Sequence, residues 1–198
     1  MGGILGVFTG GFTLEKLLIS LISSAIVVFI TMPIHEFAHG FAAEKLGDPT
    51  ARYNGRLSLN PKAHLDPFGA LMIFLMGVGW AKPVPIDSRY FARPKRDTAI
   101  TAVAGPLANL LLAFVSLFVG NAVYFGSLLT NSLVIKNILD FVYMIFLYIA
   151  MINISLAVFN LVPIPPLDGS KILAAFLPDR TYYRLMAYER WFSFILFA

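Results

Sequence analysis

LLISLISSAIVVFITMPIHEFAHGF, residues 17–41, joins a run of uncharged residues to two histidines and a glutamate. The uncharged part, LLISLISSAIVVFITMPI, has about the eighteen residues that an α-helix needs to cross the hydrocarbon core of a bilayer. His35, Glu36 and His39 follow at its end. Ionisable side chains in a spanning helix are costly and usually functional. The stretch therefore predicts a membrane helix that ends in a reactive site.

The composition of the chain is that of a membrane protein. Of its 198 residues, 58% are hydrophobic and 13% are charged, whereas soluble domains carry about a quarter charged residues. The length fits one domain, which we expect to cover residues 1–198. Basic residues are not interleaved with aromatic residues as in a nucleic-acid groove, so we expect lipid and not nucleic acid as a partner. The chain has no cysteine, which excludes thiolate metal sites.

Further apolar runs predict the other helices. We expect three core transmembrane helices, over residues 14–46, 98–120 and 136–161. The loop between the last two would contain Gly126, Thr130 and Asn131. Residues 68–80 are apolar but too few to cross a bilayer, so they predict a re-entrant or half-buried segment. Residues 180–198 are typical of the start of a further, partial helix.

Short segments between the helices predict β-strands at the membrane edge. ILGVF, residues 4–8, is typical of an edge strand. ARYNGRLSL, residues 51–59, predicts a hairpin, because Asn54-Gly55 favours a tight turn between strands. KPVPI, residues 82–86, is expected to be extended. The fold class predicted is an all-α polytopic membrane protein with small β-strands at its cytoplasmic edge.

The distribution of basic residues predicts the orientation. Residues 45–97 hold nine lysines and arginines, whereas the loop near 121–136 offers only Lys136. The positive-inside rule places residues 45–97 in the cytoplasm. His35 and, after two further crossings, Asp168 would then both lie on the cytoplasmic side of what we expect to be the cell membrane.

The spacing of HEFAH predicts a metal site. His35 and His39 are one helical turn apart, so both imidazoles can bind one ion. Glu36 lies where its carboxylate can take a proton from a water on that ion. The alternative interpretation is a pair of histidines directed to the membrane surface, with Glu36 paired to a lysine.

A catalytic zinc takes three protein ligands and keeps one open position. Glu44 is on the same helix but is rotated partly away from the histidines. His64 lies in a polar loop, where an ordinary loop histidine is the first interpretation. Asp168 follows a proline-broken helix end on the predicted side, and is the strongest candidate for the third ligand. Its alternative role is capping the helix that follows.

In these residues the chain resembles the site-2 protease family of intramembrane zinc metalloproteases. The resemblance covers essentially the whole length and rests on HEFAH at 35–39, GRLSLNP at 55–61, GWAKPVPI at 79–86, AGPLAN at 104–109 and NLVPIPPLDG at 160–169. It implies one zinc bound by His35, His39 and Asp168, with Glu36 as the general base. It also implies that Asn160 polarises the scissile carbonyl or holds the substrate.

The function that the resemblance implies is cleavage of a peptide bond in or next to a transmembrane segment of another protein. One alternative is a non-catalytic protein that binds metal or membrane segments, for which Glu36 would be unnecessary. Another is a metal-dependent hydrolase that acts on lipid. The chain has neither a PDZ insertion nor a nucleotide-sensing domain, which is typical of a minimal member. It stops inside WFSFILFA, where the family commonly has further helices, so a truncated and a naturally short C-terminus both stay open.

Overall fold

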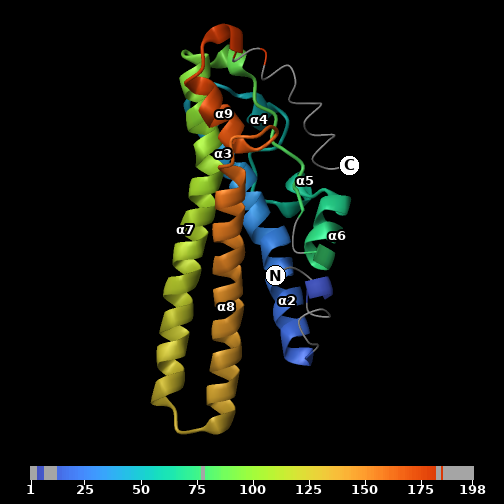
Figure 1. The fold of residues 1–198 in the computed structure, drawn as a ribbon, viewed down its shortest axis with the longest axis vertical. Helices are drawn as coiled ribbons and strands as arrows, with labels where there is room; N and C mark the ends of the chain where they lie inside the picture. The colour runs from blue at the N-terminus through green and yellow to red at the C-terminus, as the bar shows by residue number, and fades with distance from the viewer. Residues whose placement is uncertain (1–3, 7–12, 77–78, 182–183, 185–198) are drawn as a thin grey trace. The chain divides into compact units, whose positions relative to one another are not determined.

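The computed structural model describes residues 4–6, 13–76, 79–181 and 184, and all regular structure in these ranges is helical (Figure 1). The chain forms two compact units, each built from three separate segments. The first unit comprises Met1–Pro33, Leu59–Lys82 and Asn109–Ser155. The second unit comprises Ile34–Ser58, Pro83–Ala108 and Leu156–Ala198.

The first long helical stretch is continuous but not uniform. It consists of α2 (Leu14–Ile26), a π-helical turn η1 (Val27–Thr31) and α3 (Met32–Lys45). Thr13 begins it, because its hydroxyl accepts a hydrogen bond from the Lys16 N–H at 3.2 Å. Pro33 cannot donate to the carbonyl one turn earlier, and the widened π turn lies directly before it. The helix is therefore widened beside this proline.

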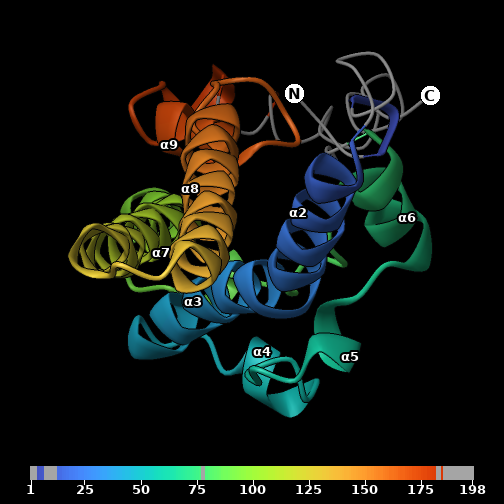
Figure 2. The ribbon, with the colours of Figure 1, turned by 90° about the horizontal axis from the view of Figure 1, so that it is seen from below.

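Two longer helices are α7 (Pro94–Leu129) and α8 (Leu133–Asn160). Their parts within residues 109–155, which belong to the first unit, run side by side (Figures 1 and 2). Gly120 permits their close approach, since a Cβ there would lie 2.9 Å from the Cβ of Phe146. The rings of Tyr124 and Tyr143 also meet, with centroids 5.0 Å apart. The predicted loop is confirmed at Thr130 and Asn131 but is wrong at Gly126, because α7 continues to Leu129. Inside a bilayer every backbone polar group needs a partner, which outweighs the low helix propensity of glycine, about 1 kcal/mol.

A buried side-chain amide on α8 forms a hydrogen bond with the first helical stretch. The Nδ2 atom of Asn153 donates to the Ile149 carbonyl at 2.9 Å and to the Thr31 hydroxyl at 3.3 Å. Asn153 and Thr31 are 0% and 2% exposed, so neither group is satisfied by water. This polar contact is therefore a link between helices in an otherwise apolar region.

The predicted small β-strands are not found in the described residues. Residues 50–53 form a helical turn, α4 (Thr50–Tyr53), in place of the first hairpin strand. Asp48 starts this turn, because its carboxylate accepts from the Thr50 N–H at 2.9 Å. Residues 82–86 have no regular secondary structure and belong to no sheet. Residues 4–6 of the predicted edge strand are helical, and the rest of that strand lies outside the described residues.

Shorter helices complete the described chain. They are α5 (Pro61–His64), α6 (Pro67–Met76), the 3₁₀ turn η2 (Ser88–Tyr90) and α9 (Asp168–Ala175). Helix α6 has 10 residues, about 15 Å, which is too short to cross a bilayer. It packs against α2 within the first unit. The predicted C-terminal helix falls largely on residues outside those described.

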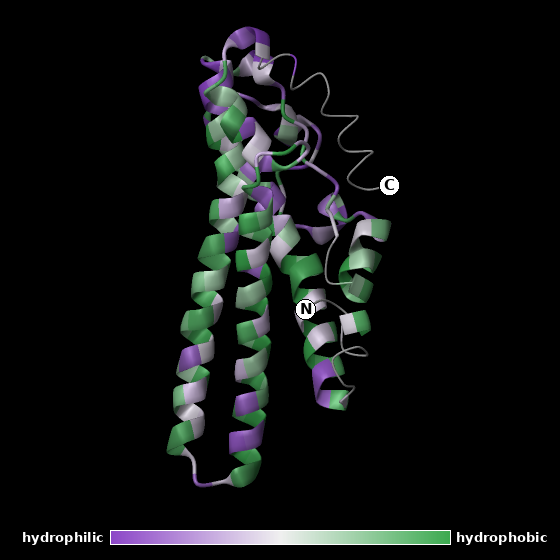
Figure 3. Cartoon of the chain, viewed as in Figure 1, coloured by the Kyte–Doolittle hydropathy of each residue, from purple (hydrophilic) through white to green (hydrophobic). Residues whose placement is uncertain are grey.

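Three stretches are long and apolar enough to cross a membrane: Leu14–Lys45, Pro94–Leu129 and Leu133–Asn160. Figure 3 shows hydrophobic residues along most of α7 and α8. Many of their large side chains are exposed, among them Phe114, Phe118 and Phe125 at 66%, 71% and 62%. Exposed apolar surface of this extent requires lipid as its solvent. The structure thus agrees with the predicted class, an all-helical membrane protein with three long apolar helices.

Candidate metal centre

Two histidines and one aspartate converge in the second unit. The Nε2 atoms of His35 and His39 are 3.0 Å apart, and their rings are nearly perpendicular at 87°. The Oδ2 atom of Asp168 lies 3.5 Å from the first of these nitrogens and 3.2 Å from the second. The three side chains are 12%, 8% and 10% exposed. Helix α3 contributes both histidines and α9 contributes the aspartate, which is distant in sequence.

The spacing of these three atoms fits a tetrahedral zinc ion. Ligand atoms at zinc–nitrogen and zinc–oxygen distances of about 2.0–2.2 Å are about 3.3–3.5 Å from one another in a tetrahedron. The separations of 3.0, 3.2 and 3.5 Å are close to that edge length. Three protein ligands also leave the fourth position for water or substrate, as a catalytic zinc requires.

The partner of His39 fixes its tautomer. Its Nδ1 atom donates to the backbone carbonyl of Thr101 at 2.8 Å, because a carbonyl can only accept. In the neutral ring Nε2 is then an acceptor, and it faces the carboxylate oxygen of Asp168. Two acceptors at this separation repel unless a cation lies between them. The site is therefore arranged for a cation, and the Thr101 carbonyl orients a ligand in the way that metal-bound histidines usually require.

Burial of the Asp168 carboxyl opposes its ionisation. Where a proton on His35 or His39 takes the place of the cation, hydrogen bonding with these imidazoles outweighs that cost and holds the pKa of Asp168 well below the usual range. The group is thus an anion at neutral pH, as a metal ligand must be. Leu167 occupies the cap position of α9 without a side-chain cap, and Asp168 is in its first turn. The carboxylate is directed to the histidines and does not cap the helix.

Helix α7 closely approaches the rings of His35 and His39 at Gly105. A Cβ on Gly105 would lie 2.4 Å from Nε2 of His39 and 2.6 Å from Cε1 of His35. These distances are far below van der Waals contact, so a larger residue at this position displaces the rings. Gly105 was not among the predicted site residues, although the sequence offered two signals: a glycine inside a predicted helix and its place in the AGPLAN segment at 104–109.

We expect Gly105→Ala to weaken zinc binding about ten- to a hundredfold, as changes beside metal ligands usually do. The methyl group must push His39 away from the Thr101 carbonyl or from Asp168. The measurement is zinc per chain after equilibration with buffered zinc. Gly126→Ala on the same helix is the control, since the nearest atom to its new Cβ is 3.9 Å away. Parental zinc affinity in Gly105→Ala would contradict the steric argument.

The other predicted site residues lie as follows. Glu36 is next to the first histidine, and its Oε2 atom accepts from the Val84 N–H at 2.9 Å. The amide of Asn160 donates to the Leu156 carbonyl at 3.0 Å, within its own helix. Glu44 is paired with Arg52 and is not in the metal-ligand group. His64 is 1% exposed and belongs to the first unit.

Comparison with known proteins identifies the family. Residues 23–196 match the model of Peptidase family M50. The chain belongs to peptidase family M50, the site-2 protease family. The M50 chain is 36% identical to "Putative zinc metalloprotease YwhC" of Bacillus subtilis (strain 168), over 87% of this chain and 76% of that protein. Zinc is therefore its cofactor, and the His35, His39 and Asp168 group is the candidate zinc site.

More distant relatives agree with this family. "Putative zinc metalloprotease Rip2" of Mycolicibacterium smegmatis is 28% identical over 82% of this chain, which spans 60% of Rip2. "Putative zinc metalloprotease MJ0611" of Methanocaldococcus jannaschii is 32% identical over 77% of this chain and 69% of that protein. No solved structure matches the M50 chain.

Proposed function

We propose that this M50 protease hydrolyses a peptide bond in or beside a transmembrane segment of another membrane protein. The observation that carries the proposal is the meeting of His35, His39 and Asp168, with ligand atoms within 4.8 Å of one another. Both histidines belong to the apolar stretch Leu14–Lys45, which is long enough to cross a membrane. A site on such a helix is accessible to a substrate that lies in the bilayer. When bound, zinc supplies a Lewis acid and a water of pKa near 7.

Glu36 is proposed as the general base. Its Oε2 atom is held by the Val84 N–H at 2.9 Å, which fixes the carboxylate beside His35. The other oxygen, Oε1, can accept a proton from water and later give it to the leaving amine. Glu36 is outside the group of metal ligands, as a base must be. This carboxylate is also what distinguishes a hydrolase from the non-catalytic metal-binding alternative, because metal binding does not need it.

Asn160 is proposed to bind the substrate carbonyl. One of the two N–H groups of its amide is used by the Leu156 carbonyl, at 3.0 Å. The other N–H remains for a peptide oxygen of the substrate. The alternative is a purely structural bond within α8, which the same contact supports.

The substrate must be unwound to be cut, because a helix keeps its carbonyls in its own hydrogen bonds. A strand-like segment such as residues 82–86 could hold such a peptide only through free main-chain N–H and carbonyl groups. Pro83 and Pro85 have no N–H, and the N–H of Val84 is taken by Glu36. The Pro83 carbonyl in turn accepts from Arg56 at 3.1 Å. Residues 82–86 therefore position the base and have little capacity left to form a ladder with substrate.

The distribution of basic residues supports a proposal for the side of the membrane on which the site lies. The basic residues between 45 and 97 favour a cytoplasmic position for the site, in a multi-pass protein of the cell membrane. The proposed catalytic groups come from residues 35–168, in agreement with a single protease domain over residues 1–198.

We expect purified protein to contain about one zinc per chain and to cut a single-span membrane protein in reconstituted vesicles. Chelation should abolish cleavage, and equimolar zinc should restore it, because water activation depends on the ion. The measurement is metal analysis together with electrophoresis of a panel of single-span proteins. Unchanged cleavage after complete zinc removal would contradict the proposal. So would a zinc-loaded protein that cuts no member of a broad panel.

A further inference from the structure

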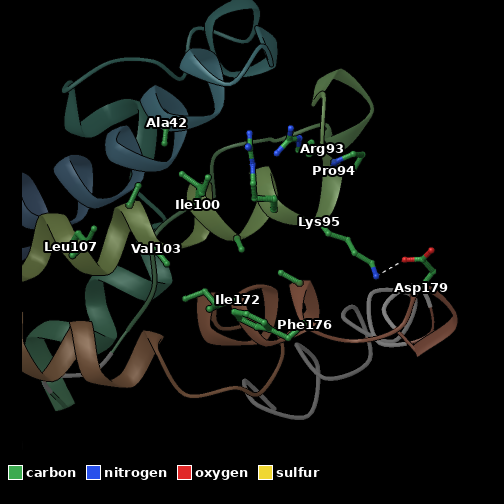
Figure 4. Close-up of a pocket in the computed structure, with 14 residues that line it drawn as sticks. Ala42, Arg93, Pro94, Lys95, Ile100, Val103, Leu107, Ile172, Phe176 and Asp179 are labelled. Atoms are coloured by element: carbon green, nitrogen blue, oxygen red, sulfur yellow. Dashed lines mark ion pairs between the residues drawn. The ribbon is translucent and has the colours of Figure 1, made fainter.

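A groove of about 870 Å³ runs between α3, α7 and α9 in the second unit (Figure 4). One wall is formed by Ile100, Val103 and Leu107 of α7, which follow one another at helical spacing. Ile172 and Phe176, at the C-terminal part of α9, face them. Phe176 is 81% exposed and Leu107 is 57% exposed, so these side chains do not fill the groove. The body of the groove is apolar and open.

Cationic side chains gather at one end of the groove. Arg93, Lys95 and Arg96 line it there, against a single acidic residue, Asp179. Lys95 is paired with Asp179, and Arg96 with Asp97. The exposed guanidinium of Arg93 lies close enough to Asp97 for electrostatic attraction to its carboxylate, but within the described residues Asp97 makes its ion pair with Arg96 and not with Arg93. The end of the groove therefore carries net positive charge, with one cation available for an anionic ligand.

The cationic end of the groove and its apolar wall are arranged like the headgroup and the acyl chains of a phospholipid. The charged residues of α7 are all in its first turn, at 95–97, and the uncharged part that could cross a membrane follows them, so we place this first turn near the membrane surface. From Arg93 to Leu107 the helix rises about 20 Å, at 1.5 Å per residue. The hydrocarbon part of one leaflet is about 15 Å thick, half of the bilayer core. The cations thus lie at headgroup depth, and Ile100 to Leu107 lie at acyl-chain depth.

We propose that this groove binds an anionic phospholipid, with the phosphate against Arg93 and an acyl chain along Ile100, Leu107 and Phe176. A peptide is a poorer occupant, because its backbone groups would find no partners along the apolar walls. The main-chain N–H groups at positions 93 and 94 do not contribute to phosphate binding in this proposal. The Arg93 N–H already donates to Asp97 at 2.9 Å, and Pro94 has none. The proposal is independent of the protease function.

The natural absence of cysteine allows a single fluorescent label to report on the groove. Ile100→Cys would carry a bimane group in nanodiscs that contain brominated phosphatidylglycerol or brominated phosphatidylcholine at equal mole fractions. We expect the anionic lipid to occupy the site about fivefold more strongly, since one cation near the surface contributes about that factor. Phe118→Cys, elsewhere on α7 and 71% exposed in the parent, is the control label and should be quenched equally by both lipids.

Arg93→Gln in the Ile100→Cys protein should remove most of the preference for the anionic lipid. Arg52→Gln is the matched control, because it removes a cation that is paired with Glu44 outside the groove. Zinc content reports that both variants are folded. Equal quenching by the two lipids at position 100, or a preference that survives Arg93→Gln but not Arg52→Gln, would overturn the proposal. Relief of quenching by an added acidic peptide would overturn it in favour of a peptide site.

Discussion

Replacing Glu36 by glutamine is expected to lower kcat for a reconstituted membrane substrate by about 10²- to 10⁴-fold, the range that general acid–base catalysis supplies. The amide has nearly the size of the carboxylate but cannot take a proton from water. Zinc content should stay at the parental value, because Glu36 is not in the group of metal ligands. The measurements are single-turnover cleavage and zinc per chain on the same preparation.

Glu44→Gln is the matched control for Glu36→Gln. It makes the same change on the same helix, but the carboxylate that it removes is paired with Arg52. We expect it to leave the cleavage rate within about twofold, as the loss of an exposed ion pair has little energetic effect. A Glu36→Gln protein that cuts as fast as the parent would move the base to another residue. Equal losses in both variants would indicate damage to α3 and not loss of a base.

Asp168→Ala is expected to weaken zinc binding by more than about a hundredfold, because groups that only orient ligands already contribute ten- to a hundredfold. The change removes the anionic member of the candidate ligand group in the described residues and leaves the two imidazoles 3.0 Å apart without it. Competition with a chromophoric chelator measures the affinity directly. The variant should lose cleavage in parallel with zinc, and excess zinc should restore part of both.

Lys171→Ala, on the same helix α9, controls for the Asp168 experiment. It lies outside the described metal-ligand group, so we expect parental zinc affinity. Equal zinc retention by the two variants would place the third ligand elsewhere in the chain. Equal loss would instead indicate that α9 itself had become detached from its neighbours.

The sequence could predict the parts of the site that depend on local periodicity. The spacing of His35 and His39 requires only that the chain be helical there, and the composition made that expectation strong. Predicting Asp168 required further information, since it lies far from the two histidines in the sequence. The order of apolar runs placed it on the same side as the histidines, and the structure brings its carboxylate to them. The catalytic roles of Glu36 and Asn160 stay predictions.

The parts that could not be predicted depend on contacts between distant elements. Nothing in the sequence indicates that the Thr101 carbonyl meets His39, or that Gly105 makes room for both rings. The hairpin predicted at Asn54-Gly55 was wrong for a local reason. The carboxylate of Asp48 binds the Thr50 N–H and starts a helical turn, which competes with a strand for the same residues.

The two groups that orient the proposed catalytic apparatus, the Thr101 carbonyl and the Val84 N–H, both belong to the main chain. Every amino acid has a carbonyl, and every one except proline has an N–H. Side chains at positions 84 and 101 are therefore free to diverge among homologues as long as they fill their buried spaces. The information that aligns the proposed base and the candidate ligand therefore resides in the path of the backbone at these two positions and not in the side chains that they carry.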